Sequence, residues 1–155
     1  MVELLVVFAI IALGVSLVVL ALPDGEAAKL EEEGARLSSL LESARAEARV
    51  AGVAVRWVPR ASPPDEAQAS ADVAQFQFVG LPTQVQMPTR FLDARTQAQV
   101  VGSNHLLLGP EAILPAQRLV LRLGERRLEL ASDGLAPFAE PAPEGTEGAA
   151  SGPSS

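Results

Sequence analysis

The chain opens with an apolar segment, Leu4 to Leu22, that holds no charged residue and is preceded directly by Glu3. A helix of about 20 apolar residues, rising about 1.5 Å per residue, matches the roughly 30 Å hydrocarbon core of a bilayer. Gly14 and Ser16 interrupt the run, and both are small enough to lie in a contact between helices. The sequence therefore predicts a transmembrane helix over residues 1–22 with an ionisable group at its edge.

A cleaved signal peptide is the alternative interpretation of this segment. The apolar part of a signal peptide usually has about 7 to 15 residues, follows a basic stretch and precedes a small-residue cleavage site. Here the run is longer, no Lys or Arg precedes it and no such site follows, so we favour a membrane span. Asp24 and Glu26 come before the first cation, Lys29. Because positive charge is retained in the cytoplasm, this acidic flank predicts a periplasmic C-terminal domain.

The first residues, MVELLVVFAIIA, resemble the N-terminal signature of type IV pilins and type II secretion pseudopilins. In that superfamily a prepilin peptidase cuts a Gly-Phe-Thr-x-x-Glu motif, and the new N-terminus is methylated. The peptidase site is absent from this sequence, and we expect it upstream of Met1. The resemblance implies that Glu3 pairs with the N-terminal ammonium of a neighbouring subunit and fixes register during assembly. It also implies helix-packing roles for Leu4, Leu5, Phe8 and Gly14.

Residues 23–52 are predicted to form an amphipathic helix that ends at Gly52. Apolar residues recur at spacings of three, four and seven and so share one face of this helix. These residues are Leu30, Leu37, Leu41, Ala44, Ala48 and Ala51. Glu32 with Arg36, and Glu42 with Arg45, are expected to pair on the opposite, solvated face.

Short apolar runs separated by turn residues predict a β-rich domain over residues 53–138. Strands are expected at Val53 to Val58, Val73 to Val79, Gln84 to Met87, Gln97 to Val101 and His105 to Leu108. Trp57 is expected to pack in the core or at its edge. The strongest signal is a hairpin in RLVLRLGERRLEL, in which leucines alternate on both sides of a Gly124-Glu125 turn. Residues 139–155 are rich in Pro, Gly, Ser and Glu and predict a disordered tail.

The segment RLSSLLESARAEARVAGVAV resembles the helix and first strand of the minor pseudopilin H and FimT group. The matching residues are Arg36, Leu37, Leu40, Leu41, Glu42, Ala44, Arg45, Glu47, Ala48, Gly52 and Val55. The resemblance implies an α+β, pilin-like fold class, in which a long N-terminal α-helix with a transmembrane first half packs on a C-terminal antiparallel β-sheet domain.

The same resemblance implies a function and a set of partners. The function is that of a minor pseudopilin near the tip of the type II secretion pseudopilus, which takes part in protein export across the outer membrane. The protein would lie in the bacterial inner membrane as a single-pass protein before assembly. The implied partners are the other minor pseudopilins, the major pseudopilin, the inner-membrane assembly platform and the prepilin peptidase.

No pattern of catalytic residues occurs in the sequence. His105 follows Gly102-Ser103-Asn104 in a predicted turn, and no nucleophile-elbow pattern surrounds a serine. Because the chain has no cysteine and a single histidine, we expect no zinc site. Phosphate-binding and calcium-binding loop patterns are also missing. We therefore expect no enzyme activity, no metal and no cofactor.

The alternative function is that of a FimT-like minor type IV pilin that binds DNA during uptake. The residues that would contact the phosphates are the hairpin arginines Arg118, Arg122, Arg126 and Arg127. Glu125 and Glu129 are interleaved with them, and the formal net charge of the chain is −7, so nucleic-acid binding is the less favoured interpretation. An unrelated single-span protein with a periplasmic β-rich domain is the remaining alternative.

Overall fold

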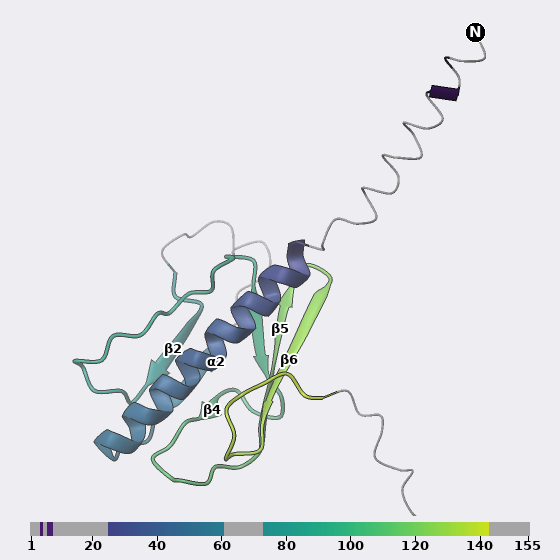
Figure 1. The fold of residues 1–155 in the computed structure, drawn as a ribbon. Helices are drawn as coiled ribbons and strands as arrows, with labels where there is room; N and C mark the ends of the chain where they lie inside the picture. The colour runs from purple at the N-terminus through teal and green to yellow at the C-terminus, as the bar shows by residue number, and fades with distance from the viewer. Residues whose placement is uncertain (1–3, 5, 8–24, 61–72, 143–155) are drawn as a thin grey trace, which may run out of the picture.

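The computed structural model describes Leu4, Val6, Val7, residues 25–60 and residues 73–142 (Figure 1). Its main elements are one long helix and six strands. The helix is α2, Gly25–Ala51, and the strands are β1, Arg56–Pro59; β2, Phe76–Val79; β3, Gln97–Val100; β4, Leu106–Leu107; β5, Gln117–Leu123; and β6, Arg126–Ser132. The helix lies across β5 and β6, which it contacts along its length (Figure 1).

Helix α2 packs through the apolar face that its periodicity predicted. Leu30, Leu37, Leu41, Ala44 and Ala48 are buried, whereas Ala51 at the C-terminal end is exposed. The predicted stop is confirmed, because Gly52 follows the helix with φ +65° and the next amide, Val53 N, donates to Ala48 O at 3.1 Å. Full burial of each leucine contributes about 1.5–3 kcal/mol.

The expected fold class is wrong. The expectation was a long N-terminal helix with a transmembrane first half, packed on one antiparallel sheet. The structure instead has a 27-residue helix, α2, with charged residues along its length, and two three-stranded antiparallel sheets, ordered β2-β1-β4 and β3-β5-β6. No helix in the described part of the chain is long and apolar enough to cross a membrane. Most of the predicted span lies outside the described residues.

A side chain explains why the strands form two sheets rather than one. At the start of β5, the Gln117 amide takes the place of a neighbouring strand at the outer edge of β4. Leu107 N donates to Gln117 Oε1 at 2.7 Å, and Gln117 Nε2 donates to Leu107 O at 2.9 Å. Because these bonds satisfy the β4 backbone, β4 needs no strand partner on that side. The Gln117 side chain thus links β5 of one sheet to β4 of the other.

The predicted hairpin is confirmed. Strands β5 and β6 pair antiparallel from Gln117↔Ser132 to Leu123↔Arg126, with Gly124 in the turn at φ +57°. The alternating leucines all lie on the buried side of the hairpin, against α2. They are Leu119, Leu121, Leu123, Leu128 and Leu130.

The other strand predictions are partly correct. Strands β1, β2, β3 and β4 lie in or beside four of the predicted ranges but are shorter. No strand forms at Gln84 to Met87, where Val85 N donates to Pro82 O at 3.0 Å and the chain turns. Alternation of polar and apolar residues over so short a run does not distinguish a strand from a turn next to a proline.

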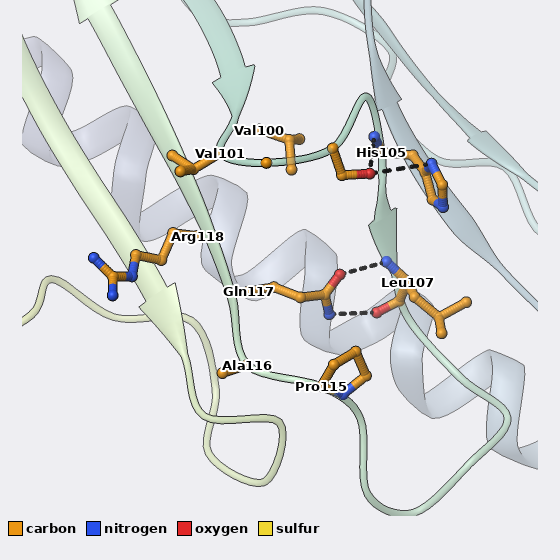
Figure 2. Close-up of a pocket in the computed structure, with 10 residues that line it drawn as sticks. Val100, Val101, His105, Leu107, Pro115, Ala116, Gln117 and Arg118 are labelled. Atoms are coloured by element: carbon orange, nitrogen blue, oxygen red, sulfur yellow. Dashed lines mark hydrogen bonds between the residues drawn. The ribbon is translucent and has the colours of Figure 1, made fainter.

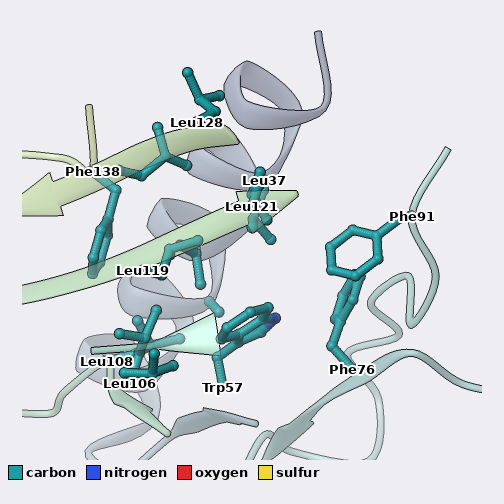
Figure 3. Packing of buried hydrophobic residues seen from close by; sticks show 14 of the residues in the cluster. Leu37, Trp57, Phe76, Phe91, Leu106, Leu108, Leu119, Leu121, Leu128 and Phe138 are labelled. Atoms are coloured by element: carbon teal, nitrogen blue, oxygen red, sulfur yellow. The ribbon is translucent and has the colours of Figure 1, made fainter. Parts of the chain in front are cut away.

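The core combines leucines of α2 and of the β5–β6 hairpin with aromatic residues of β1, β2 and the loop after β2 (Figure 3). Trp57 is fully buried, as predicted, and its ring centroid lies 5.7 Å from that of Phe76. The centroid of Phe91 lies 4.9 Å from Phe76 on the other side. Both distances between ring centroids lie in the range of about 4.5–7 Å over which aromatic side chains attract each other. The residues 80–96 between β2 and β3 are thereby fixed to the core.

Two charged residues of α2, Glu33 and Arg45, are buried, and the burial of Arg45 contradicts its predicted place on a solvated face. Glu33, 1% exposed, accepts from Arg36 Nη1 at 2.8 Å and from the backbone amide of Leu92. Arg45, 2% exposed, donates to the carbonyls of Gly134 and Leu135 and lies 3.7 Å from Glu42. Arg36 thus pairs with Glu33 rather than Glu32. Each buried charge fixes a loop to the helix.

Candidate functional site

The N-terminal residues with predicted assembly roles are largely outside the described part of the chain. Glu3, Leu5, Phe8 and Gly14 all lie there, whereas Leu4 is helical and 65% exposed. The roles of these residues in register and packing therefore stay predictions.

The structure brings three of the four hairpin arginines together. In the β5–β6 register, Arg122 lies directly opposite Arg127, and Arg118 lies opposite Ala131. Side chains alternate between the faces of a strand, so Arg118, Arg122 and Arg127 share the face turned away from α2. Arg126, opposite Leu123 beside the turn, belongs to the other face by the same alternation. We call the face with Arg118, Arg122, Arg127 and Glu129 the arginine face.

Glu129 lies in the middle of the arginine face and compensates part of its charge. Its carboxylate is 3.7 Å from Arg118 Nη1 and 3.3 Å from Arg127 Nη2. Arg118 and Arg127 are more than half exposed, so each pair contributes only about 0–1 kcal/mol. The face keeps a positive surplus, and Arg122 and Arg127 are like charges at one cross-strand position.

A groove of about 570 Å³ lies beside this face, where the two sheets separate (Figure 2). Its walls come from the end of β3 with the following loop, from β4, and from the start of β5. The Gln117–Leu107 hydrogen bonds cross it (Figure 2). Arg118 lines the groove and also belongs to the arginine face.

Ser103 and His105, which line the groove, do not form a nucleophile and base. Ser103 Oγ lies 3.5 Å from His105 Nδ1, but Asn104 Oδ1 lies closer to that nitrogen, at 2.7 Å. Because an amide oxygen only accepts, Nδ1 carries the proton and cannot take one from the serine. Ser103 Oγ instead accepts from His105 N at 3.3 Å. The three residues form the turn that the sequence predicted.

A surface cluster of ion pairs connects the first turn of α2 to the loop before β3. Asp93 binds Arg95 Nη2 at 2.9 Å and lies 3.6 Å from Lys29 Nζ, and Arg95 Nη1 reaches Glu26 at 3.2 Å. The hydrogen bonds and positive charge of Arg95, with a smaller effect of Lys29, lower the pKa of Asp93 from 3.8 to about 2. The charged form of Asp93 is therefore favoured in the folded protein.

This shift predicts a pH dependence of stability. Because the folded-state pKa lies below the unfolded one, the contribution of Asp93 is complete above pH 3.8 and disappears as the pH falls through about 2. We expect the difference in unfolding free energy between the wild type and Asp93→Asn to shrink over that interval. Urea titrations at several pH values measure it, and a constant difference would contradict the assignment.

Sequence reasoning missed Gln117, Glu33 and Arg45, although the sequence held a signal for two of them. Glu33 is three residues after Leu30 and four before Leu37, and Arg45 is four after Leu41 and three before Ala48. These spacings place both on the apolar face of α2. No comparable local signal exists for Gln117, whose partner is fixed by tertiary packing.

Comparison of the chain with family models, curated proteins and solved structures gave no match.

Proposed function

We propose that this protein is a minor pseudopilin, a structural subunit near the tip of a type II secretion pseudopilus that takes part in protein export. The observation that carries the proposal is the N-terminal sequence, an apolar run with one carboxylate at position 3. In this proposal the run lies in the inner membrane before assembly and among the helices of the fibre afterwards. The C-terminal domain is periplasmic.

The anchoring of α2 in the domain supports a structural role. A subunit that is extracted from a membrane through its N-terminal helix transmits force to its folded domain through the next segment of chain. Here that segment is α2, which begins at Gly25 and is held by buried leucines and by two buried charges. Glu33 holds the loop at Leu92, and Arg45 holds the loop at Gly134. The helix is therefore attached to the domain at both halves of its length.

The proposal assigns Glu3 a role in assembly, which a substitution tests. In a water-poor helix bundle a carboxylate is tolerated only when it is paired, here with the N-terminal ammonium of a neighbouring subunit. We expect Glu3→Ala, made in the full-length precursor, to insert into the membrane and to be cleaved normally but to be absent from sheared fibres. Membrane fractionation, a cleavage assay and immunoblots of the fibre fraction measure the three steps.

The matched control is Glu31→Ala, which removes an exposed carboxylate on α2. This variant should enter the fibre as the wild type does. Normal incorporation of Glu3→Ala would remove the register role. Failure of the wild type itself to enter any fibre would contradict the proposed function.

A further inference from the structure

The outer edge of β6 accepts a polypeptide chain in antiparallel pairing. β6 is the last strand in the order β3-β5-β6. At its C-terminal end, Ala131 N donates to Ala139 O at 2.8 Å and Ala139 N donates to Ala131 O at 3.0 Å. Phe138, next to this bridge, is buried against the core, and Ala139 is exposed. The chain's own C-terminal segment thus begins an additional strand.

A proline explains why this additional strand stops after one pair. Hydrogen-bonded positions alternate in an antiparallel ladder, so the next pair in the same register is Glu129 with Pro141. Proline has no backbone N–H and cannot donate to the Glu129 carbonyl. Residues 140–142 accordingly have no strand partner.

Along the first half of the β6 edge, the backbone has no strand partner among the described residues. The N–H and C=O of Ala131 point away from β5, toward Ala139. Because backbone groups alternate between the two sides of a strand, those of Glu129 and Arg127 point the same way. Beyond the Ala131 bridge, no strand among the described residues pairs with this edge. Such a row of donors and acceptors is what an extended peptide uses when it adds to a sheet.

The charge of the arginine face determines which kind of peptide would pair best with the β6 edge. A residue paired with Arg127 would place its side chain on that face, next to Arg127 and one strand further from Arg122. A carboxylate there forms a favourable cross-strand pair with Arg127 and offsets part of the surplus positive charge of the face. A residue paired with Glu129 would be uncharged, since Glu129 already contacts Arg118 and Arg127. A basic chain is repelled at the same position.

We propose that the outer edge of β6 binds an extended acidic segment of another polypeptide by strand addition, through the backbone of Arg127 and Glu129. The proposal names an interaction surface and does not depend on the proposed place in a secretion fibre. Pro141 keeps residues 140–142 from occupying the same backbone positions.

The test uses the full chain in detergent micelles and a fluorescent, acetylated and amidated peptide of alternating threonine and valine with one threonine replaced by glutamate. We expect saturable binding by anisotropy and slower hydrogen exchange at the amides of Arg127 and Glu129. The same peptide with lysine in place of glutamate should bind about tenfold more weakly, because one favourable cross-strand pair becomes unfavourable. No saturable binding, or equal affinity for both peptides, would overturn the proposal.

Two protein variants separate backbone from charge recognition. Glu129→Pro removes the outward N–H but no bond to β5, and should lose binding, whereas its matched control Glu129→Ala should retain it. Arg127→Glu, at an exposed position that needs no refolding of the core, should reverse the preference and favour the lysine peptide. Unchanged preference in Arg127→Glu would contradict the proposal. Displacement of the peptide by duplex DNA, lost in Arg127→Glu, would assign the face to nucleic acid instead and overturn strand addition.

Discussion

Replacing Gly134 with alanine is expected to destabilise the domain by about 3–5 kcal/mol. Gly134 has φ +94°, a conformation that costs a residue with a side chain about 1–3 kcal/mol. An added Cβ would also overlap the carbonyl oxygen of Leu114, which is backbone and cannot rotate away. The loop would have to move, and the hydrogen bonds of the Gly134 carbonyl to Leu114 N and Arg45 would be lost with it.

Urea denaturation of Gly134→Ala against Gly102→Ala measures this effect. Gly102 also has a positive φ, +75°, but an added Cβ there would meet nothing within 4 Å. The control therefore isolates the cost of the backbone conformation, about 1–3 kcal/mol. Equal losses in the two variants would show that the contact with Leu114 contributes nothing.

The second large effect is expected for Arg45→Ala, a loss of about 3–5 kcal/mol in unfolding free energy. Arg45 is buried, and its guanidinium holds the carbonyls of Gly134 and Leu135 against α2. Alanine would leave a cavity and remove donors from buried carbonyl groups, each loss costing about 1–3 kcal/mol. Glu42, whose Oε1 has no hydrogen bond and lies 3.7 Å from Arg45, would lose its neighbouring cation.

The control for this prediction is Arg49→Ala, one turn further along the same helix. Arg49 is exposed, so its loss should change the unfolding free energy by no more than about 0.5 kcal/mol. Hydrogen exchange should in addition show faster opening near Gly134 in Arg45→Ala than in Arg49→Ala. Similar stabilities of the two variants would contradict the role of Arg45 as the tie between α2 and the C-terminal loop.

Features that depend on neighbours in the sequence were predictable. The apolar face of α2 follows from spacings of three and four residues, and the β5–β6 hairpin follows from alternating leucines around Gly124. The grouping of Arg118, Arg122 and Arg127 could have been derived in the same way, since alternation on both strands of a hairpin with a known turn assigns each residue to a face. The prediction that grouped all four arginines was wrong for Arg126, because the same alternation places it on the opposite face.

The contacts between segments far apart in the sequence were not predictable. Arg45 was expected on a solvated face, because charged residues are usually exposed unless polar groups meet them in the core. The spacing of Glu33 and Arg45 could have placed both on the apolar face, but it does not name the groups that they contact. Their partners are backbone groups of Leu92 and Gly134, 59 and 89 positions away in the chain. The sequence likewise gave no reason to expect that Gln117 would bind the edge of β4 and separate the strands into two sheets.

Short-range periodicity and composition were enough to predict the apolar segment after Glu3, the amphipathic helix that became α2, and the hairpin. Packing between distant segments set three further features: the division of the strands into two sheets, the partners of the two buried charges of α2, and the lack of a strand partner, among the described residues, along half of the β6 edge. Nearly every residue offers the same backbone N–H and C=O groups. The identity of a residue therefore does not show whether its backbone binds a distant side chain or strand.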